Sequence, residues 1–588
     1  MILVRVHSVS ALVLVHASLL LGWGFWDSLF DSGPTAPDAS ATRAAVADGL
    51  ADAHALHPAT AAVYGSDPAL LWRASAQRRI AAQALARAPF DGISAEAVYA
   101  PAAVRAVKAA DDAEAWWQSL GDAARDTLAD PRPALLAEAD VRLSDGLLRL
   151  GDALRGRRTD AAKLYRGTWF PHVRDTADVA FDALGAAIRT GDARRIERAL
   201  DGLRPQQAGY ERLRERLVAL QEDLAPIPAG PVLAVGGRSV RVPHLRERLV
   251  AYGYVAADTL GAWERPEPYL LDSLLASGLA QFELAHGLPV NRALEAADTD
   301  ALNADPTALR ARLALNLERW RWLPDSFGAD YVWVNIPAFE LRVMHETGEA
   351  GGGRAEERLR MPVNVGNALT TGWTTPVIRD SVHTVEFQPA WYVPNSLAGG
   401  LFASARADSL ALWRRGVDVT LNGRPVDSRL VLWDSVSSAG FRFVQRPGAS
   451  NPLGRVKFLM HNPYAILIHD TDKRYTFADG TGSSMSSGCV QAGAPDKLAE
   501  YLLTTVNGWA PGEAEAAYRR GPRRGVRLET PFPSQFVYFT ASAEADGRLR
   551  LFGDPYGYDR RLAEALGLDL GPEEVVAATD DASPGRSS

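Results

Sequence analysis

Two segments indicate the fold of the C-terminal half of this chain. They are Asn462-Pro463-Tyr464-Ala465-Ile466-Leu467-Ile468-His469-Asp470-Thr471 and Ser486-Ser487-Gly488-Cys489-Val490. The apolar run before His469 predicts a strand, and the second segment predicts a loop that enters another strand. Cys489 is the single cysteine of 588 residues, so it cannot form a disulfide within the chain. A lone cysteine is more often a small buried apolar residue, but this setting favours a nucleophile.

A nucleophilic Cys489 needs a base, because a free thiol is mostly protonated at neutral pH. His469 is the predicted base, since an imidazole titrates near neutrality and two strands can bring residues twenty apart within reach. Alternation along the strand points the Asp470 side chain away, so we expect a backbone carbonyl to orient the ring. His461 is a weaker alternative base. The N–H groups of Gly488 and Cys489 are the expected donors to an oxyanion.

The two segments together resemble the active-site signature of the YkuD-type L,D-transpeptidases, which are cysteine enzymes of the bacterial cell wall. Stretches 334–339, 389–394, 446–448, 453–458 and 536–540 are similar to the large, multidomain subgroup, so the resemblance covers most of residues 42–570. It implies Cys489 and His469 as catalytic residues. The residues expected to contact substrate are Ser486, Ser487, Tyr464, Asn462, Gln491, Arg446 and Trp391.

The sequence departs from the family pattern beside the nucleophile. The family usually carries Arg two residues after the cysteine, where this chain has Gln491, so one cation is missing and Arg446 or Arg455 is a candidate replacement. Ser487 stands where many relatives have His. These differences bear on substrate affinity more than on the type of reaction.

The fold class implied is multidomain α+β. Leucines at helical spacing, such as Leu143, Leu147, Leu150 and Leu154, predict an α-helical scaffold domain over 42–230. Residues 231–305 resemble a three-helix peptidoglycan-binding module, although Glu283 replaces the usual Gln. Alternating apolar residues predict a mainly β region over 325–570. The family resemblance implies that this region is the catalytic domain and that residues from about 394 to 440 form a capping subdomain over the cleft.

The chain ends are predicted from composition. Arg5 and the apolar run that follows predict a signal peptide or membrane anchor over 1–26, and Pro, Gly and small residues predict a linker over 27–41. Residues 571–588 are predicted to be a disordered tail. The expected location is the periplasm, with the N-terminal segment either retained in the inner membrane or cleaved.

The charge balance argues against nucleic acid as a partner, because 63 Lys+Arg against 71 Asp+Glu gives a net charge of -8 without a long basic run. No His, Asp, Glu or Cys set has metal-ligand spacing, so we predict no metal and no cofactor. The resemblance implies peptidoglycan stem peptides as substrate, and other cell-wall synthesis proteins are candidate partners. The implied reaction forms 3-3 crosslinks through a cysteine thioester. A hydrolase of the same fold and a non-catalytic wall-binding scaffold remain as alternatives.

Overall fold

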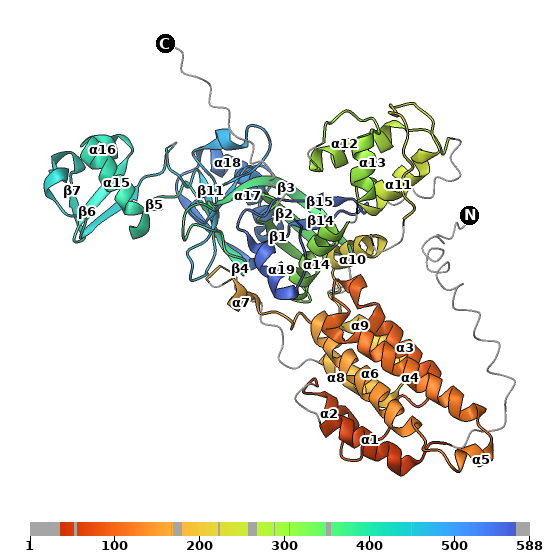
Figure 1. Ribbon diagram of the computed structural model, residues 1–588. Coiled ribbons are helices and arrows are strands. Elements are labelled where there is room, and N and C mark those ends of the chain that lie inside the picture. Colours follow the sequence, from red (N-terminus) through yellow and green to blue (C-terminus); the bar gives the residue numbers. More distant parts are fainter. Residues whose placement is uncertain are drawn as a thin grey trace, which may run out of the picture.

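The structure, a computed structural model, describes residues 36–571 except 52–55, 166, 169–178, 221–223, 257–266, 287, 305, 348–353 and 449. The predicted segment 1–26, most of the linker and residues 572–588 lie outside this description. Within it, no helix is both long and apolar enough to cross a lipid bilayer. The chain is multidomain α+β, with a helical N-terminal region and a β-rich C-terminal region (Figure 1).

The N-terminal region packs helices around a core of Ala and Leu side chains. The first helix begins at Ala39, within the predicted linker. The predicted stripe on the longest helix is buried at Leu143, Leu147, Leu150 and Leu154. The helices are α1 (Ala39–Ala51), α2 (Thr60–Tyr64), α3 (Ser75–Ala86), α4 (Ala100–Ser119), α5 (Asp122–Arg125), α6 (Arg132–Leu154), α7 (Ala161–Leu164), α8 (Val179–Thr190), α9 (Ala193–Leu203) and α10 (Ala208–Ala219).

The next region has three short helices, α11 (Arg241–Ala251), α12 (Ser273–Ala285) and α13 (Ala296–Asn303). Glu283 is fully buried on α12, and its carboxylate accepts hydrogen bonds from the backbone of Asn291 (3.1 Å) and Arg292 (3.2 Å). It therefore fixes the turn after α12 and does not lie on a surface where a ligand could reach it. Helix α14 (Thr307–Arg321) leads from here into the β-rich region.

The β-rich region is built on a nine-stranded sheet whose pairings form a closed circuit. The circuit runs β3-β12-β10-β9-β4-β13-β1-β2 and returns to β3, while β11 adds to the free side of β3. The strands are β1 (Asp330–Asn335), β2 (Glu340–Thr347), β3 (Arg354–Gly366), β4 (Ile378–Phe387), β9 (Val456–Leu459), β10 (Ile468–His469), β11 (Ser484–Ser486), β12 (Val490–Ala492) and β13 (Arg524–Val537). Closure pairs the backbone groups that an open sheet leaves at its edges.

Apolar side chains of this sheet pack with the later helices α17 (Pro495–Asn507), α18 (Glu513–Arg520) and α19 (Tyr558–Leu566) into one core. A separate hairpin of β14 (Ala541–Ala543) and β15 (Leu549–Leu551) packs with the core of the α11–α13 region. The β-rich region thus contacts both neighbours through its C-terminal residues.

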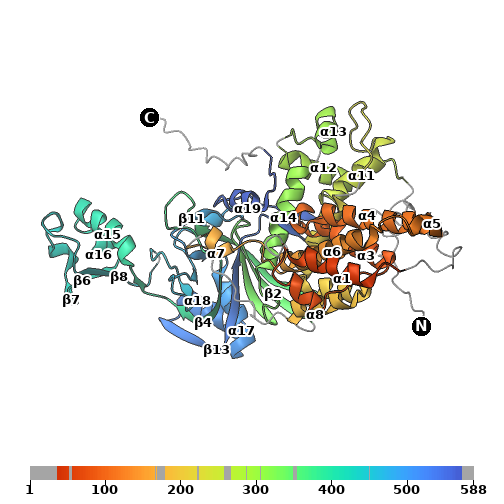
Figure 2. The ribbon, with the colours of Figure 1, turned by 60° about the horizontal axis from the view of Figure 1, so that its bottom comes forward.

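An insertion between β4 and β9 forms its own small unit. It contains β5 (Trp391–Tyr392), α15 (Asn395–Ala407), α16 (Ala411–Arg414), β6 (Val417–Leu421), β7 (Arg424–Val426) and β8 (Phe441–Gln445). Its core includes Phe402, Trp433 and Phe441, and it is separate from the core of the large sheet. Figures 1 and 2 show it projecting away from the nine-stranded sheet, whereas a cap over the site was expected. Because the insertion buries its own aromatic side chains, it does not need the large sheet to cover them.

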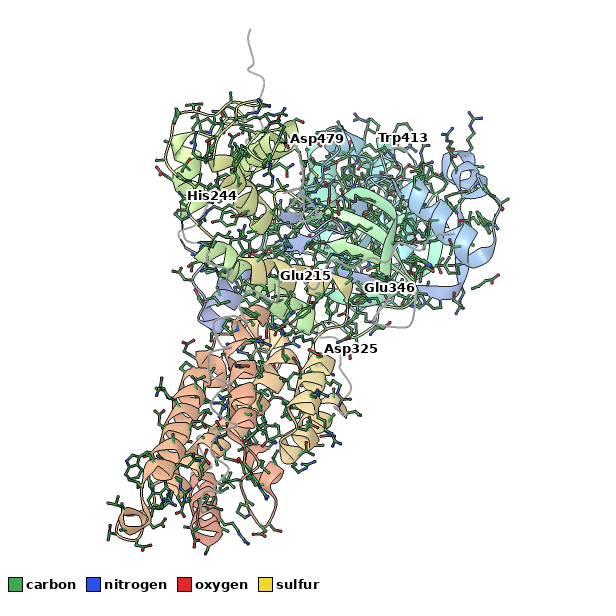
Figure 3. All side chains as sticks on the ribbon, turned by 90° about the vertical axis from the view of Figure 1, so that its right-hand side faces the viewer. Glu215, His244, Asp325, Glu346, Trp413 and Asp479 are labelled. Atoms are coloured by element: carbon green, nitrogen blue, oxygen red, sulfur yellow. The ribbon has the colours of Figure 1, made fainter. Side chains whose placement is uncertain are left out.

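The helical and β-rich regions contact each other partly through polar groups, one of which, Asp325, is labelled in Figure 3. Arg155 of the helical region lies 3.6 Å from the Asp325 carboxylate. The Tyr165 hydroxyl donates to the Tyr558 carbonyl at 2.7 Å, and the Tyr558 hydroxyl donates to Thr168 at 2.6 Å. These bonds tie the loop after α7 to α19 of the β-rich region.

Candidate active site

His469 and Cys489 come from two paired strands of the large sheet. Strand β10 pairs in parallel with β12, so Ile468 lies opposite Val490 and His469 opposite Gln491. Cys489 directly precedes β12 and is two residues from Gln491. Since side chains two residues apart in a strand point the same way, the thiol and the imidazole emerge on the same face.

The turn before the nucleophile is held by side-chain hydroxyls. Gly488 has a φ of 115°, and a Cβ there would lie 3.2 Å from Ile466 Cδ1, so both backbone and space favour glycine. Ser486 Oγ donates to the Cys489 carbonyl at 2.5 Å and accepts from the Gly488 N–H at 3.1 Å. Thr375 Oγ1 donates to the Gly488 carbonyl at 2.7 Å. The Gly488 N–H is therefore already engaged, which leaves the Cys489 N–H as the better placed of the two expected oxyanion donors.

The Cys489 thiol is half-buried beside the 462–466 turn. Its Sγ lies 3.7 Å from the carbonyl of Ala465, a residue with a φ of 56°. Asn462 fixes this turn, because its Nδ2 donates to the Ile466 carbonyl and its Oδ1 accepts from the Ile466 N–H. Burial raises the pKa of Cys489. Among the described residues the Sγ–H donates to the Ala465 carbonyl, and no hydrogen bond joins Sγ to the ring of His469.

His469 is 5% exposed, and its ring is oriented by a backbone carbonyl, as predicted. Nδ1 is hydrogen-bonded to the carbonyl oxygen of Asp470. A carbonyl only accepts, so Nδ1 carries the proton and Nε2 has a free lone pair in the neutral ring. Burial lowers the pKa of His469 to about 4, against the opposing effect of the Asp470 carbonyl. The imidazole is therefore neutral at pH 7 and able to accept a proton.

The carboxylate of Asp470 points into a separate buried network. It accepts from the Arg455 N–H at 2.8 Å, from Arg474 Nη2 at 2.5 Å and from the Tyr518 hydroxyl at 3.1 Å. A Cβ on Gly454 would overlap this carboxylate. The network fixes the residue whose carbonyl orients His469, so Arg474 and Tyr518 act on the ring indirectly.

Polar neighbours flank His469 on both adjacent strands. On β12, the Gln491 side-chain carbonyl accepts from Asn364 Nδ2 at 3.2 Å. On β9, Lys457 lies opposite His469 and pairs with Glu386 at 3.0 Å, with both side chains nearly buried. The nearest cation in this row of the sheet is thus Lys457, already neutralised by a carboxylate.

The residues expected to contact substrate divide into three groups. Ser487 is exposed and Tyr464 is 41% exposed, so both are accessible near the thiol. The side chains of Asn462 and Ser486 form hydrogen bonds within the turns described above, and the Gln491 side chain is hydrogen-bonded to Asn364. Trp391 and Arg446 belong to the stem of the projecting insertion.

Each arginine proposed as a replacement cation contacts a group other than the thiol or His469. The Arg446 guanidinium pairs with Asp418 at 2.5 Å within the insertion. The Arg455 guanidinium lies over the Tyr518 ring, 5.8 Å from its centroid. His461 stacks on His383 with ring centroids 4.0 Å apart. Among the described residues, no group of three or more His, Cys, Asp or Glu side chains is arranged to hold a metal.

Sequence reasoning missed Thr375 and Tyr556, which support the nucleophile turn from a distance. The Tyr556 hydroxyl donates to the Gly366 carbonyl at 2.9 Å and accepts from the Thr375 N–H at 3.1 Å. Both lie far along the chain from Cys489, in stretches without a motif. The role of Arg474 was also missed, although it lies four residues after Asp470 in the predicted loop.

Comparison with known proteins places Cys489 and His469 in a recognised domain. Residues 329–511 match the L,D-transpeptidase catalytic domain of the YkuD family, and residues 58–217 match a scaffold domain. A relative from Haemophilus influenzae, described as a putative L,D-transpeptidase, is 28% identical over 255 residues. That match covers 43% of this chain and 48% of the relative, so the chain aligns with about half of the relative's length.

A solved structure from Clostridium acetobutylicum, described as a fused Zn-dependent amidase/peptidase/peptidoglycan-binding domain-containing protein, is also similar. It matches at 10% identity over 52% of this chain and 100% of that chain, with a TM-score of 0.14. A score this low establishes no shared fold. The catalytic match ends at residue 511, although β13, which lies beyond it, is part of the closed circuit of strands.

Proposed function

We propose that this chain, which carries a YkuD-type L,D-transpeptidase catalytic domain and a scaffold domain, joins peptidoglycan stem peptides by 3-3 crosslinks with Cys489 as the nucleophile. The observation that carries the proposal is the parallel pairing of β10 and β12, which brings a half-buried thiol and a neutral imidazole to one face of the sheet. The same activity places the working domain outside the cytoplasm, with residues 1–26 as the proposed export signal or anchor.

The proposed reaction has two balanced steps. The Cys489 sulfur attacks the carbonyl that joins diaminopimelate to the terminal D-Ala of a donor tetrapeptide, while His469 Nε2 takes the thiol proton. The imidazolium returns that proton to the departing amine, so D-Ala leaves and a thioester remains. The side-chain amine of a second stem then attacks the thioester, His469 removes its proton, and the thiol is restored. The Cys489 N–H is the proposed oxyanion donor.

A hydrolase is the second candidate, because the insertion projects away from the sheet and Ser487 beside the nucleophile is exposed. Water would then compete with the acceptor amine for the thioester. Within this proposal, residues 231–305 form a peptidoglycan-binding module, and the insertion acts as a capping subdomain only if its two-strand stem bends.

The test is intact-protein mass spectrometry with a tetrapeptide muropeptide and, separately, with a carbapenem. A thioester adduct should map to Cys489 and be absent from Cys489→Ala, which has no other thiol to react. Crosslinked muropeptide dimers support transpeptidation, whereas free tripeptides alone support the hydrolase. A Cys489→Ala variant with full activity would refute both and favour a wall-binding scaffold.

A further inference from the structure

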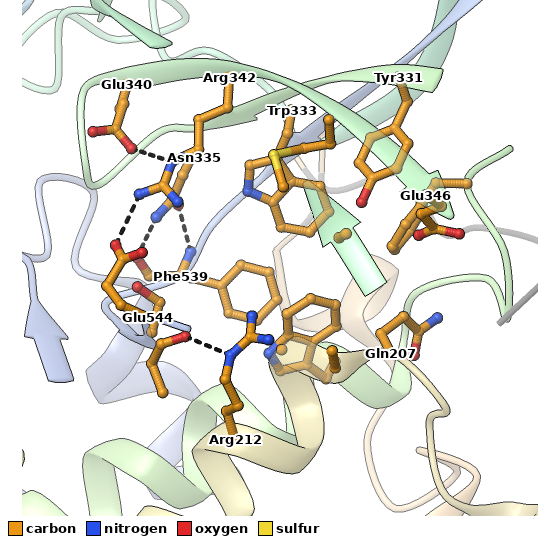
Figure 4. Close-up of a pocket in the computed structure, with 18 of the residues that line it drawn as sticks. Gln207, Arg212, Tyr331, Trp333, Asn335, Glu340, Arg342, Glu346, Phe539 and Glu544 are labelled. Atoms are coloured by element: carbon orange, nitrogen blue, oxygen red, sulfur yellow. Dashed lines mark hydrogen bonds and ion pairs between the residues drawn. The ribbon is translucent and has the colours of Figure 1, made fainter. Parts of the chain in front are cut away.

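A cavity lies away from the thiol, between helix α10 and strands β1 and β2 (Figure 4). Its volume is about 120 Å³, and neither Cys489 nor His469 lines it. For scale, a cavity of about 150 Å³ accepts benzene. The space therefore suits a single ring edge or a small substituent, and not a stretch of peptide.

The walls of this cavity are aromatic and rigid. The rings of Trp320 and Trp333 stack with centroids 5.6 Å apart, and Trp333 stacks on Phe539 at 5.8 Å. Trp320 also packs on the backbone of α10, where a Cβ on Gly209 would lie 2.3 Å from the indole. Both tryptophans remain partly exposed. Fixed indole faces offer an apolar surface at little cost in side-chain entropy.

Two polar groups in the wall lack partners. Gln207 is 7% exposed; its Nε2 donates to the Pro324 carbonyl at 2.7 Å, while its Oε1 has no partner in the described structure. Arg212 donates from Nε to the Ala543 carbonyl at 3.1 Å, and no acceptor for its two Nη groups is found among the described residues. The buried, unpartnered Gln207 carbonyl costs free energy that a ligand would recover, and the half-buried Arg212 guanidinium can donate to the same ligand. A ligand that satisfies both groups needs a hydrogen-bond donor for the Gln207 carbonyl and an acceptor for the Arg212 guanidinium.

The charges around the cavity favour a neutral ligand. Glu340 and Glu544 share Arg342 and Arg550 as ion partners, with separations of 2.5 to 3.2 Å. Glu346 lies in the same wall, and its pKa is raised by burial. These carboxylates disfavour an anion at Arg212, and Arg212 itself disfavours a cation. A secondary amide meets the requirement, because its carbonyl accepts from Arg212 and its N–H donates to Gln207.

We propose that this cavity binds the N-acetyl group of an amino sugar, with the apolar face of the sugar ring against Trp320 or Trp333. Resting on the proposed function, the natural source is the glycan strand that carries the stem peptides. The glycan would then be held at the junction of α10 with β1 and β2 while the stem is processed at Cys489, elsewhere on the sheet.

The test measures binding of a β-1,4-linked N-acetylglucosamine tetramer to the full-length protein. Tryptophan fluorescence and saturation-transfer NMR monitor the binding. Saturable binding is expected, with at least tenfold weaker binding of the deacetylated tetramer. Arg212→Met and Gln207→Leu should each weaken binding at least tenfold. Arg198→Met is the matched control, since Arg198 is exposed on α9 and does not line the cavity. Circular dichroism melts establish that each variant is folded, and Arg212→Lys replaces Arg212→Met if the latter is not.

The proposal is overturned if the wild type does not bind the tetramer, if the pocket variants bind as well as the control, or if acetylated and deacetylated tetramers bind equally. Displacement of the tetramer by a sugar-free stem peptide would assign the cavity to peptide amides and also overturn it. Binding does not require the thiol. If the protein forms the thioester but does not bind the glycan, this inference alone is refuted. If it binds the glycan but does not form the thioester, the proposed function alone is refuted.

Discussion

The backbone carbonyl of Asp470, and not its carboxylate, holds the imidazole of His469. The carboxylate of Asp470 instead accepts hydrogen bonds from Arg474 and Tyr518. The base is thus oriented through two linked sets of hydrogen bonds, and the outer set makes no direct contact with the imidazole.

Tyr518→Phe should lower kcat about tenfold while leaving KM unchanged. The change removes the hydrogen bonds that the Tyr518 hydroxyl makes with Asp470 and Arg474. A hydrogen bond to a charged group is worth about 1.5 kcal/mol, and 1.36 kcal/mol corresponds to a tenfold change in rate. Steady-state kinetics with a muropeptide substrate measure both constants. Tyr501→Phe is the matched control, because that hydroxyl bonds to Asp330 on β1. An unchanged kcat in Tyr518→Phe would show that Tyr518 does not position the ring.

The pH profile should reflect the buried position of His469. Burial lowers its pKa from 6.5 to about 4, so the ring stays neutral until the pH falls near 4. The acid limb of kcat/KM, which reports the free enzyme, should accordingly lie near pH 4. A limb near 6.5 would mean that the ring is solvated in the working enzyme.

The same burial predicts local destabilisation in acid. Between pH 6.5 and about 4 the unfolded chain binds a proton at His469 that the folded chain does not, so stability is lost as the pH falls through this window. The full loss is about 3 kcal/mol. Hydrogen exchange at the amides of β10 and β12 should rise across the window in the wild type and change less in His469→Gln. Equal slopes in the two proteins would argue against this origin.

Gly488→Ala should reduce reaction at the thiol more than it reduces overall folding. Its φ of 115° is unfavourable for alanine, and the added Cβ approaches Ile466. The expected local cost is about 1–3 kcal/mol. Iodoacetamide labelling of Cys489 and a thermal melt measure the two effects. Gly553→Ala is the control, because no atom lies within 4 Å of a Cβ built there. Equal labelling rates for both variants would contradict the strained turn.

Gln491→Arg should increase the reactivity of Cys489. The guanidinium would stand on the strand face shared by the thiol and His469, where a positive charge stabilises the thiolate and lowers the pKa of the thiol. The midpoint of the alkylation rate against pH should fall by about one unit. Gln491→Glu, of nearly the same size as the native side chain, should move the midpoint the other way. Shifts of the same sign in both variants would mean that packing, and not charge, is responsible.

Much of the site follows from short stretches of sequence. Alternation around His469 predicts that Asp470 turns its side chain away, because a two-residue period needs only local information. The supports of the nucleophile turn could not be found this way. Thr375 contacts Gly488 across 113 residues, and Tyr518 contacts Asp470 across 48, so their roles depend on how distant elements pack.

The sequence also predicts the local elements of the fold, but not how all of them are arranged. Leucine spacing predicts helices such as α6, and alternating apolar residues predict the β-rich region. The insertion has its own aromatic core around Phe402 and Trp433, and no local sequence pattern predicts how it is oriented relative to the large sheet. Glu283 departs from the pattern of the peptidoglycan-binding module, and its burial against the turn after α12 could not be predicted from the sequence.

The closed circuit of strands has a consequence for how such a protein can diverge. Moving β12 by one residue against β10 would separate nucleophile from base, and it would also break the register of β12 with its other neighbour in the ring, β3. Added or lost residues are therefore tolerated in the connections between strands, as the segment between β4 and β9 illustrates. Related chains should differ widely in these connections while the number of residues within β10 and β12 stays constant.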